Sequence, residues 1–233
     1  MARGLFIGVL LFWCVLASAA DCVVLLHGLA RSATSMNKMQ RALVEAGYET
    51  ANIAYPSRHY SVEELAQIAV TDGLHACQSN GEIERVHFVT HSLGGILLRQ
   101  YLSVGDIPLL GRVVMLAPPN QGSAAVDELA GVPGFNWLNG PAGRQLGKGE
   151  GSVPLALGPA DFELGIIAGN RSIDPITSAV LKNPDDGRVS VEDTKLDGMD
   201  DFVVVEHSHA FMMRMRRPIA LTIRFLENGS FSR

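Results

Sequence analysis

Apolar runs that are typical of buried strands alternate along this sequence with segments of helical periodicity. The strand-like runs cover residues 22–26, 49–56, 85–90, 112–119, 164–169 and 201–206. The helical patterns cover residues 34–47, 61–77, 93–102 and roughly 210–227. This alternation predicts an α/β fold, with a mostly parallel sheet of about six strands and helices on both faces. In such a sheet, the active crevice lies at the carboxyl ends of the strands.

Length and composition fit one globular domain. The chain has 233 residues, of which 47% are hydrophobic and 18% are charged, so it can bury a core. Its formal net charge is −5, with no basic block along the sequence. This charge pattern argues against a nucleic-acid partner and leaves a neutral or lipid-like ligand open.

The N-terminal segment is typical of a secretory signal peptide. Arg3 precedes the apolar run "LFIGVLLFWCVLASAA", which contains the small-x-small sequence Ala17-Ser18-Ala19. The pattern predicts cleavage after Ala19, which leaves residues 20–233 as the mature domain. The alternative is an uncleaved anchor, although the run is short for a membrane span. We therefore expect an exported protein, either periplasmic or secreted.

Export changes how the cysteines are interpreted. Cys14 would leave with the signal peptide, so Cys22 and Cys77 remain as an even pair in an oxidising compartment. We predict a disulfide between them, which would tie the first mature strand to the end of an early helix. The alternative is a pair of buried free thiols.

Residues 120–163 interrupt the alternation of strands and helices. Gly and Pro recur there, no strand pattern is visible, and residues 123–131 carry one short helical pattern. Because strands resume afterwards, we interpret the segment as an insertion or lid over the active site. Two groups of residues could form an apolar stripe for an acyl chain, or could instead pack the core: Phe135, Trp137 and Leu138, and Phe211, Met212 and Met213.

The segment "VTHSLGG" joins a strand to a helix through Ser92. A tight turn at this joint would hold the Ser92 hydroxyl above the sheet as a nucleophile, and the N–H of Leu93 would point at the same spot. Gly94 removes a side chain that would clash in such a turn, while Thr90 occupies a position where glycine is usual. The alternative is an ordinary turn with a helix N-cap serine.

A second backbone donor is predicted at the end of the first strand, in "LLHGLARS". A developing oxyanion needs two donors, and the loop after Gly28 can bring the N–H of Leu29 close to the serine. We interpret His27 as a structural histidine that holds this loop rather than as a catalytic one.

The sequence "HSH" at 207–209 follows the last strand and is predicted to open the last helix. A histidine at this strand end could reach Ser92 and act as general base and then as general acid. We choose His209 over His207 because His209 is nearer the helix. The pair is a weak candidate for a metal site, because it lacks further ligands, and we assign no metal.

Acidic residues in "NPDDGRVS" (183–190) precede the last strand. A buried carboxylate there could hold the histidine in the required tautomer. Asp186, directly before Gly187, is our choice over Asp185, with Asp174 as a further alternative. Any one of the three could instead be a turn-forming aspartate.

The order Ser…Asp…His is that of the α/β-hydrolase arrangement. The segments "LLHGLARS", "FVTHSLGGI", "VVMLAPPNQGS", "DDGRVS" and "EHSHAFMM" resemble α/β-hydrolases of the small lipase/esterase type, over nearly the whole mature chain. The resemblance implies a minimal α/β-hydrolase fold and no cofactor. It also implies these roles: Ser92 as nucleophile, Asp186 as acid, His209 as base, and the N–H groups of Leu29 and Leu93 as oxyanion hole.

We therefore expect a serine hydrolase that cleaves a small-molecule or lipid ester, with transient contact to a lipid surface as an open option. Three alternatives remain: a thioesterase or acyltransferase with the same triad, a non-catalytic binding protein with the hydrolase fold, and an exported scaffold. The sequence leaves the oligomeric state open.

Overall fold

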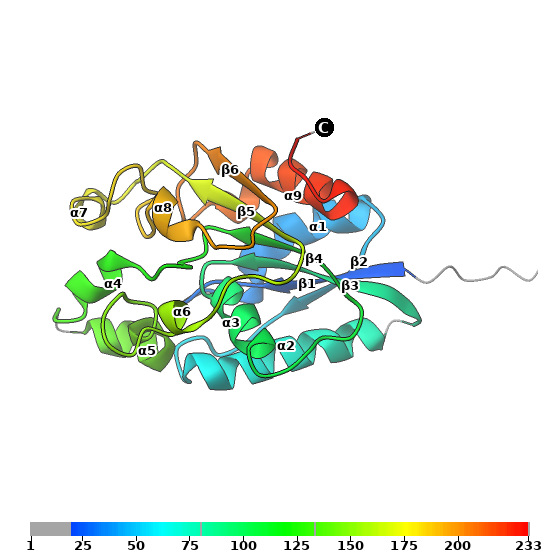
Figure 1. The fold of residues 1–233 in the computed structure, drawn as a ribbon, viewed down its shortest axis with the longest axis horizontal. Coiled ribbons are helices and arrows are strands. Elements are labelled where there is room, and N and C mark those ends of the chain that lie inside the picture. Colours follow the sequence, from blue (N-terminus) through cyan, green and yellow to red (C-terminus); the bar gives the residue numbers. More distant parts are fainter. Residues whose placement is uncertain (1–19, 80, 133, 233) are drawn as a thin grey trace, which may run out of the picture.

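We describe the fold from a computed structural model, in which residues 20–79, 81–132 and 134–232 are described (Figure 1). The predicted signal peptide, residues 1–19, lies outside the described residues, together with Cys14. No helix in the described part of the chain has the length and hydrophobicity needed to cross a bilayer.

Six parallel strands form one sheet in the order β2-β1-β3-β4-β5-β6. The strands are β1 (Ala20–Leu26), β2 (Glu49–Ile53), β3 (Ile83–His91), β4 (Leu110–Leu116), β5 (Leu164–Gly169) and β6 (Asp201–Val205). The predicted fold class and strand number are confirmed. Because every ladder among the described strands is parallel, all their carboxyl ends meet at one edge, where a cavity opens.

Helices cover both faces of the sheet (Figure 1). On one face lie α2 (Val62–Gln78) and α3 (Leu93–Leu102), and on the other lie α1 (Asn37–Glu45) and α9 (Arg216–Asn228). The sequence of β1 is a continuous apolar run because both of its faces are buried. Val24 and Leu26 pack in the core on the side of α2 and α3, while Val23 and Leu25 pack in the core on the side of α1 and α9.

The last helix begins later than the sequence predicts. The predicted helix covers 210–227, whereas residues 212–214 form a short 3-10 turn and α9 starts at Arg216. Met215 is extended, with φ −90° and ψ 144°, and Pro218 lies in the first turn of α9. A helix that started at residue 210 would place Pro218 in its interior, where it lacks an N–H and clashes with the preceding turn. His209 therefore lies in a loop rather than at a helix start.

A disulfide joins Cys22 in β1 to Cys77 in α2, as predicted, with 5.9 Å between the two Cα atoms. It closes a chain segment with a sequence separation of 55 residues that contains β2 and α2. In the chain-entropy model, a loop of that length stabilises the fold by about 4 kcal/mol.

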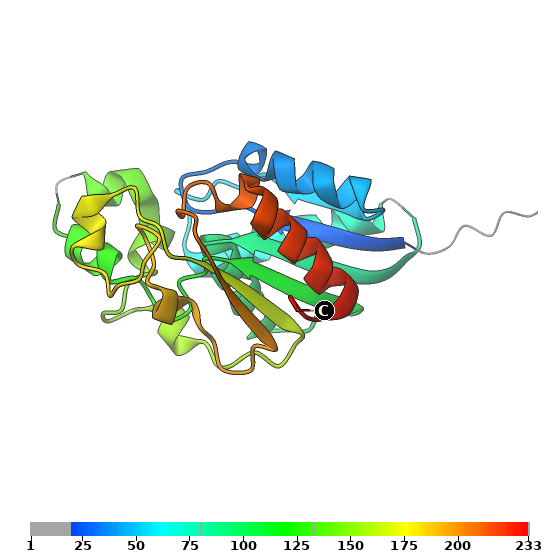
Figure 2. The ribbon, with the colours of Figure 1, turned by 90° about the horizontal axis from the view of Figure 1, so that it is seen from above.

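The segment 120–163 contains three helices: α4 (Ala124–Leu129), α5 (Phe135–Arg144) and α6 (Val153–Ala156). Only α4 matches the predicted short helix. Figure 2 shows α4 and α5 beyond one end of the sheet, near α7 (Pro175–Ser178), whereas α6 contacts α3. The glycine and proline content concealed α5, which is broken at Gly140 (φ 68°) directly before Pro141. A further short helix, α8 (Val191–Thr194), follows α7.

Arg99 of α3 connects this helix to the segment 120–163 through hydrogen bonds. Its guanidinium is buried (5% exposed) and donates to four main-chain carbonyls and one amide oxygen, at distances of 3.0–3.3 Å. The acceptors belong to Asn120, Pro154, Leu157 and Gly158. Burial without a carboxylate partner lowers the pKa of Arg99 to about 10.

Candidate functional site

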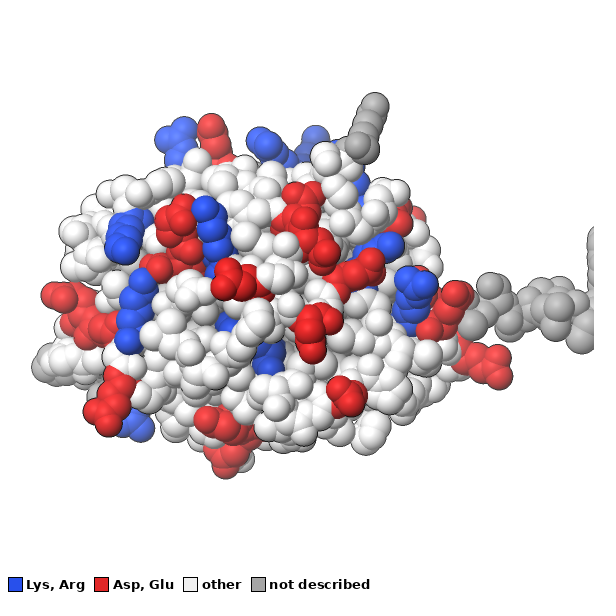
Figure 3. Space-filling model, viewed as in Figure 1, with Lys and Arg blue, Asp and Glu red and all other residues white. Residues whose placement is uncertain are grey.

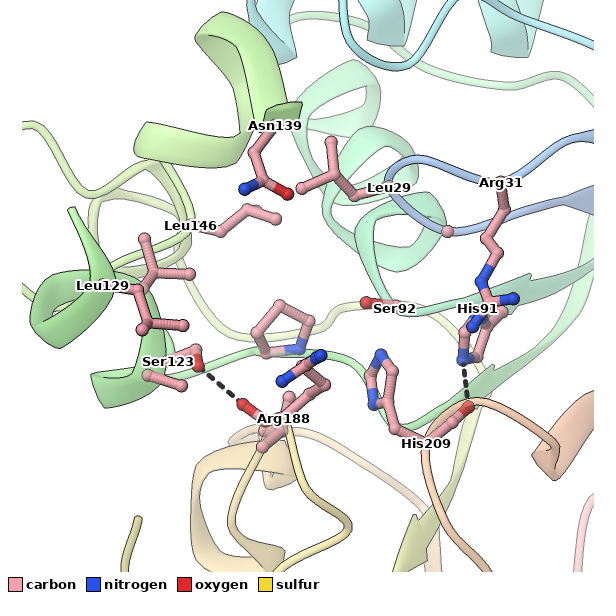
Figure 4. A pocket seen from close by; sticks show the side chains of 15 residues that line it. Leu29, Arg31, His91, Ser92, Ser123, Leu129, Asn139, Leu146, Arg188 and His209 are labelled. Carbon is pink, nitrogen blue, oxygen red and sulfur yellow. Dashed lines mark hydrogen bonds between the residues drawn. The ribbon is translucent and has the colours of Figure 1, made fainter. Parts of the chain in front are cut away.

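A cavity of about 270 Å³ opens at the carboxyl ends of the strands (Figure 4). Its lining comes from the loops after β1, β3, β4, β5 and β6 and from the segment 120–163. The lining residues are Gly28, Leu29, Arg31, His91, Ser92, Pro119, Ser123, Ala125, Val126, Leu129, Asn139, Leu146, Arg188, Val189 and His209.

Ser92 occupies the predicted tight turn between β3 and α3. Its backbone has φ 53° and ψ −119°, a strained conformation for a residue with a side chain. The N–H of Ser92 donates to Leu116 O of β4 at 2.9 Å, which fixes the turn to the neighbouring strand. The side chain projects into the cavity (Figure 4). This is the geometry of a nucleophile elbow.

Glycines around Ser92 permit the close approach of three segments. A Cβ at Gly94 would lie 2.6 Å from Leu26 O of β1, too close for any side chain. A Cβ at Gly28 would lie 2.8 Å from His91 Nδ1 and 3.3 Å from Ser92 Cβ. Glycine at both positions is therefore required for β1, its loop and the Ser92 turn to pack together.

Two backbone N–H groups near Ser92 fit the predicted oxyanion donors. Leu93 is the first residue of α3, so its N–H has no carbonyl partner in the preceding turn. The N–H of Leu29 donates to no acceptor among the described residues, and Leu29 lines the cavity beside Ser92. Neither group thus has a main-chain acceptor among the described residues, and of the two only Leu29 belongs to the cavity lining.

His27 contacts the loop that carries Leu29 and packs on Tyr55. Its Nδ1 is 2.9 Å from Gly28 O, and its ring stacks on Tyr55 with 3.9 Å between ring centroids. The Tyr55 hydroxyl donates to the main-chain carbonyl of His27. Burial lowers the pKa of His27, so the ring is neutral and Nδ1 donates to Gly28 O.

His209 projects into the same cavity and is held by Asp186. Nδ1 of His209 is 2.8 Å from Asp186 Oδ2, and the N–H of His209 donates to Asp186 O at 3.0 Å. The other carboxylate oxygen of Asp186 accepts from the N–H groups of Arg188 and Val189 at 2.9 and 2.8 Å. Asp186 is thus buried and fully hydrogen-bonded, and it fixes the ring orientation of His209.

Ser92 and His209 make no direct hydrogen bond among the described residues, although both side chains line the cavity. Bonds of this kind are often long or poorly aligned in an unliganded enzyme.

The residues considered as alternatives to His209 and Asp186 lie elsewhere or have other hydrogen-bond partners. His207 does not line the cavity. Asp185 accepts from Ser178 Oγ and the N–H of Gly187, so it stabilises its own turn. Asp174 caps α7 through the N–H groups of Ile176 and Thr177.

His91 and Gly169 are site residues that sequence reasoning missed. His91 Nε2 is 3.0 Å from His209 O, and burial holds the pKa of His91 well below its usual range. A Cβ at Gly169, the last residue of β5, would lie 2.4 Å from His207 O and 2.9 Å from Asp186 Cβ. The position of His91 next to Ser92 was a signal for the first, but nothing in the sequence pointed to the second.

None of the described side chains of the expected apolar stripe lines the cavity. Met212 and Met213 are fully buried in the core under α1 and α9, and Phe211 and Trp137 are exposed and do not line the cavity. The side chains of Phe135 and Leu138 lie outside the described part of the structure. The apolar wall is formed instead by Leu29, Pro119, Ala125, Val126, Leu129, Leu146 and Val189.

Among the described residues, no group of three or more His, Cys, Asp or Glu side chains could hold a metal ion. The face shown in Figure 3 has lysine and arginine interspersed with aspartate and glutamate, with no extended basic patch on that face.

A family model described as the alpha/beta hydrolase family matches residues 23–220. No curated protein matches the chain. Among solved structures, lipase BlEst2 of Bacillus licheniformis in its mature form is similar with a TM-score of 0.72 and 18% identity, over 89% of this chain and 92% of that one.

Two further solved structures are similar over part of their length. Phospholipase PlaB of Legionella pneumophila has a TM-score of 0.70 and 17% identity, over 91% of this chain and 60% of that one. Lipase B of Aspergillus fumigatus has a TM-score of 0.67 and 15% identity, over 92% of this chain and 55% of that one. At such identities, the likeness shows the fold.

Proposed function

The chain belongs to the alpha/beta hydrolase family, and on this basis we propose that it hydrolyses carboxylic esters through an acyl-enzyme on Ser92. One arrangement supports this above all others. Ser92, in its strained turn, opens into the same cavity as His209, and Asp186 bonds to the far nitrogen of that ring. Serine, histidine and aspartate in these relations are the parts of a nucleophilic triad.

In this mechanism, His209 Nε2 takes the proton of the Ser92 hydroxyl as the oxygen attacks the ester carbonyl. The N–H groups of Leu29 and Leu93 stabilise the oxyanion that develops on the carbonyl oxygen. His209 then gives its proton to the departing alcohol, which leaves an acyl group on Ser92. A water molecule, deprotonated by His209, releases the acid and restores the serine. Asp186 holds the ring and stabilises its cation throughout.

The apolar wall supports an acyl chain as the part of the substrate that enters the cavity. Much of that wall comes from the segment 120–163, through Ala125, Val126, Leu129 and Leu146. We propose that this segment acts as a cover over the acyl chain and that the substrate is a small-molecule or lipid ester.

We also propose that the protein is exported. The Cys22–Cys77 disulfide is of the kind that persists in oxidising compartments, and the pattern of residues 1–19 is that of a signal peptide. N-terminal sequencing of protein recovered outside the cytoplasm should begin at Ala20. A chain recovered there with Met1 intact would contradict cleavage.

The test of the activity compares the purified protein with Ser92→Ala. A fluorophosphonate probe should label the wild type, and p-nitrophenyl esters from acetyl to palmitoyl should be hydrolysed. Ser92→Ala should lose labelling and several orders of magnitude in kcat. Ser103→Ala, at the end of the same helix and outside the cavity, is the matched control.

Three results decide between the proposal and its alternatives. Turnover that survives in Ser92→Ala would contradict the proposed nucleophile. A folded wild type that neither labels nor hydrolyses any ester, with detergent present, would favour a binding protein. Parallel assays with a decanoyl thioester and with an added alcohol acceptor separate ester hydrolysis from thioester hydrolysis and acyl transfer.

A further inference from the structure

Two arginines stand at the cavity with no carboxylate among the residues that line it. Arg31 and Arg188 are both exposed and both belong to the lining, which contains no Asp or Glu. The lining itself is therefore positively charged on a chain whose formal net charge is −5, while Asp174 and Asp186 contact Arg188 and His209 from outside the lining. A site lined in this way favours a negatively charged ligand group over a neutral one.

Hydrogen bonds position the side chain of Arg188 and leave some of its N–H donors available. All its side-chain hydrogen bonds to described residues use one nitrogen: Nη1 donates to Asp174 Oδ2 at 2.8 Å, to Gly187 O at 3.2 Å and to Thr177 Oγ1 at 3.3 Å. The Nε and Nη2 groups donate to none of the described residues, so one edge of the guanidinium is available. The exposed pair with Asp174 contributes little, because solvent screens it.

The side chain of Arg31 has no hydrogen bond or ion pair to any described residue. Its charge nevertheless acts on a histidine of the site. It contributes to the low pKa of His91, whose ring lies 4.7 Å from the ring of His209. Arg31 therefore carries an uncompensated charge at the cavity mouth.

Both arginines lie on the side of the cavity where an alcohol must leave. His209 has to reach the leaving oxygen to protonate it, so the alcohol part of an ester lies beside this ring. In Figure 4 the side chain of Arg31 lies beside His91 and that of Arg188 beside His209, whereas Leu129 and Leu146 lie on the other side of the cavity. The acyl part and the charged part of a substrate would thus be separated.

We propose that the cavity takes an ester with an apolar acyl chain and an alcohol part that carries an anionic oxygen group, a phosphate or a carboxylate, bound by Arg31 and Arg188. The inference rests on the proposed esterase function and names its substrate class. Guanidinium groups pair with both anions through parallel N–H donors, which is why the two chemistries share one site.

The experiment compares matched decanoyl esters below their micelle concentrations. One pair is 1-decanoylglycerol 3-phosphate and 1-decanoylglycerol, and the other is O-decanoyl lactate and its methyl ester. The readout is the ratio of kcat/KM for the anionic and the neutral member on the same enzyme preparation, so that partial loss of folded protein cancels. We expect a ratio of about 10 or more for at least one pair in the wild type. A preference only in the glycerol pair identifies phosphate as the group recognised, and a preference only in the lactate pair identifies carboxylate. A preference in both pairs shows that the site accepts either anion.

Charge removal at the two arginines tests the assignment. Arg31→Gln and Arg188→Gln should each lower the ratio about threefold to fivefold, the range of an exposed ion pair, and the double variant should bring it close to one. Arg31→Lys and Arg188→Lys should keep most of the preference. Arg171→Gln is the matched control, because Arg171 is an exposed arginine that pairs with Glu206 and does not line the cavity.

Two results would overturn the substrate class alone. These are turnover of the esters with a wild-type ratio near one in both pairs, and a ratio that the double variant leaves unchanged. Absence of turnover for all four esters and for p-nitrophenyl decanoate would instead overturn the proposed esterase function, and the substrate class would fall with it.

Discussion

The side chain of His91 donates a hydrogen bond to the main-chain carbonyl of His209 across 3.0 Å. The residue next to the candidate nucleophile thereby fixes the backbone of the candidate base, from 118 positions away in the sequence. Because a carbonyl only accepts, Nε2 of His91 carries the proton, and Nδ1 is left without a partner among the described residues. His91 thus ties the Ser92 turn to the loop after β6.

Replacement of His91 should impair the reaction without removing any reacting group. In His91→Leu the His209 loop loses its anchor, and we expect kcat to fall about 10- to 100-fold with KM nearly unchanged, since small displacements of a base are costly. His91→Gln places an amide donor where Nε2 was and should recover most of kcat. A steady-state comparison of the three enzymes checks this. Equal loss in both variants would show that only packing matters.

The acid of the proposed triad can be identified by comparing three aspartates. Asp186→Asn should lower kcat by roughly 10³- to 10⁴-fold, because His209 would lose the partner that holds its tautomer and stabilises its cation. Asp185→Asn and Asp174→Asn are matched variants whose carboxylates serve a turn and a helix cap. They should change thermal stability more than kcat. A loss of kcat in either that equals the loss in Asp186→Asn would contradict the assignment.

Removal of the Arg99 side chain should destabilise the cover and the helix beneath it. Arg99→Met leaves four main-chain carbonyls without their donor, in two buried and two part-buried hydrogen bonds, and we expect the free energy of unfolding to fall by about 3 kcal/mol. Urea unfolding and limited proteolysis within 120–163 measure the effect. Arg85→Met, on an exposed position of β3, should change stability by less than about 0.5 kcal/mol. Unchanged proteolysis in Arg99→Met would show that the cover is held by other contacts.

Stability should fall as the pH drops below about 6.5, the unfolded-state pKa of histidine. Burial lowers the pKa values of His27, His87 and His91 in the folded protein, so the unfolded chain binds protons first on acidification. Each such histidine can contribute up to about 1.4 kcal/mol per pH unit, so the slope for all three has a limit of about 4 kcal/mol per pH unit. Urea unfolding between pH 7.5 and 5.5 measures the slope, and His91→Gln should reduce it. A free energy of unfolding that is constant over this range would refute the prediction.

The sheet could be predicted from the sequence because strands buried on both faces leave a strong pattern. The run at 22–26 had to alternate its side chains between two cores, and a parallel sheet provides them. The Cys22–Cys77 pairing followed from residue count and compartment. Prediction failed where glycine and proline hide a helix, as at Gly140 and Pro141 in α5, and where an extended residue delays one, as at Met215 before α9.

The candidate site also has parts that the sequence could predict and parts that it could not. Ser92 and its glycines form a local pattern that one strand and one helix explain. By contrast, the anchor from His91 to His209 and the two cavity arginines depend on loops that only the folded sheet brings together. The hydrophobic periodicity of the sequence does not indicate such contacts, because they join loops that follow different strands.

The burial of Arg99 limits how this enzyme could be recombined with its relatives. Its acceptors lie on both sides of α4 and α5 in the sequence, at Asn120 and at residues 154–158, while the donor belongs to the helix that follows Ser92. A chimera that exchanged residues 120–163 alone would leave a buried cation facing a foreign backbone. The segment 120–163 and α3 are therefore a single module for exchange, and variation in one constrains the other.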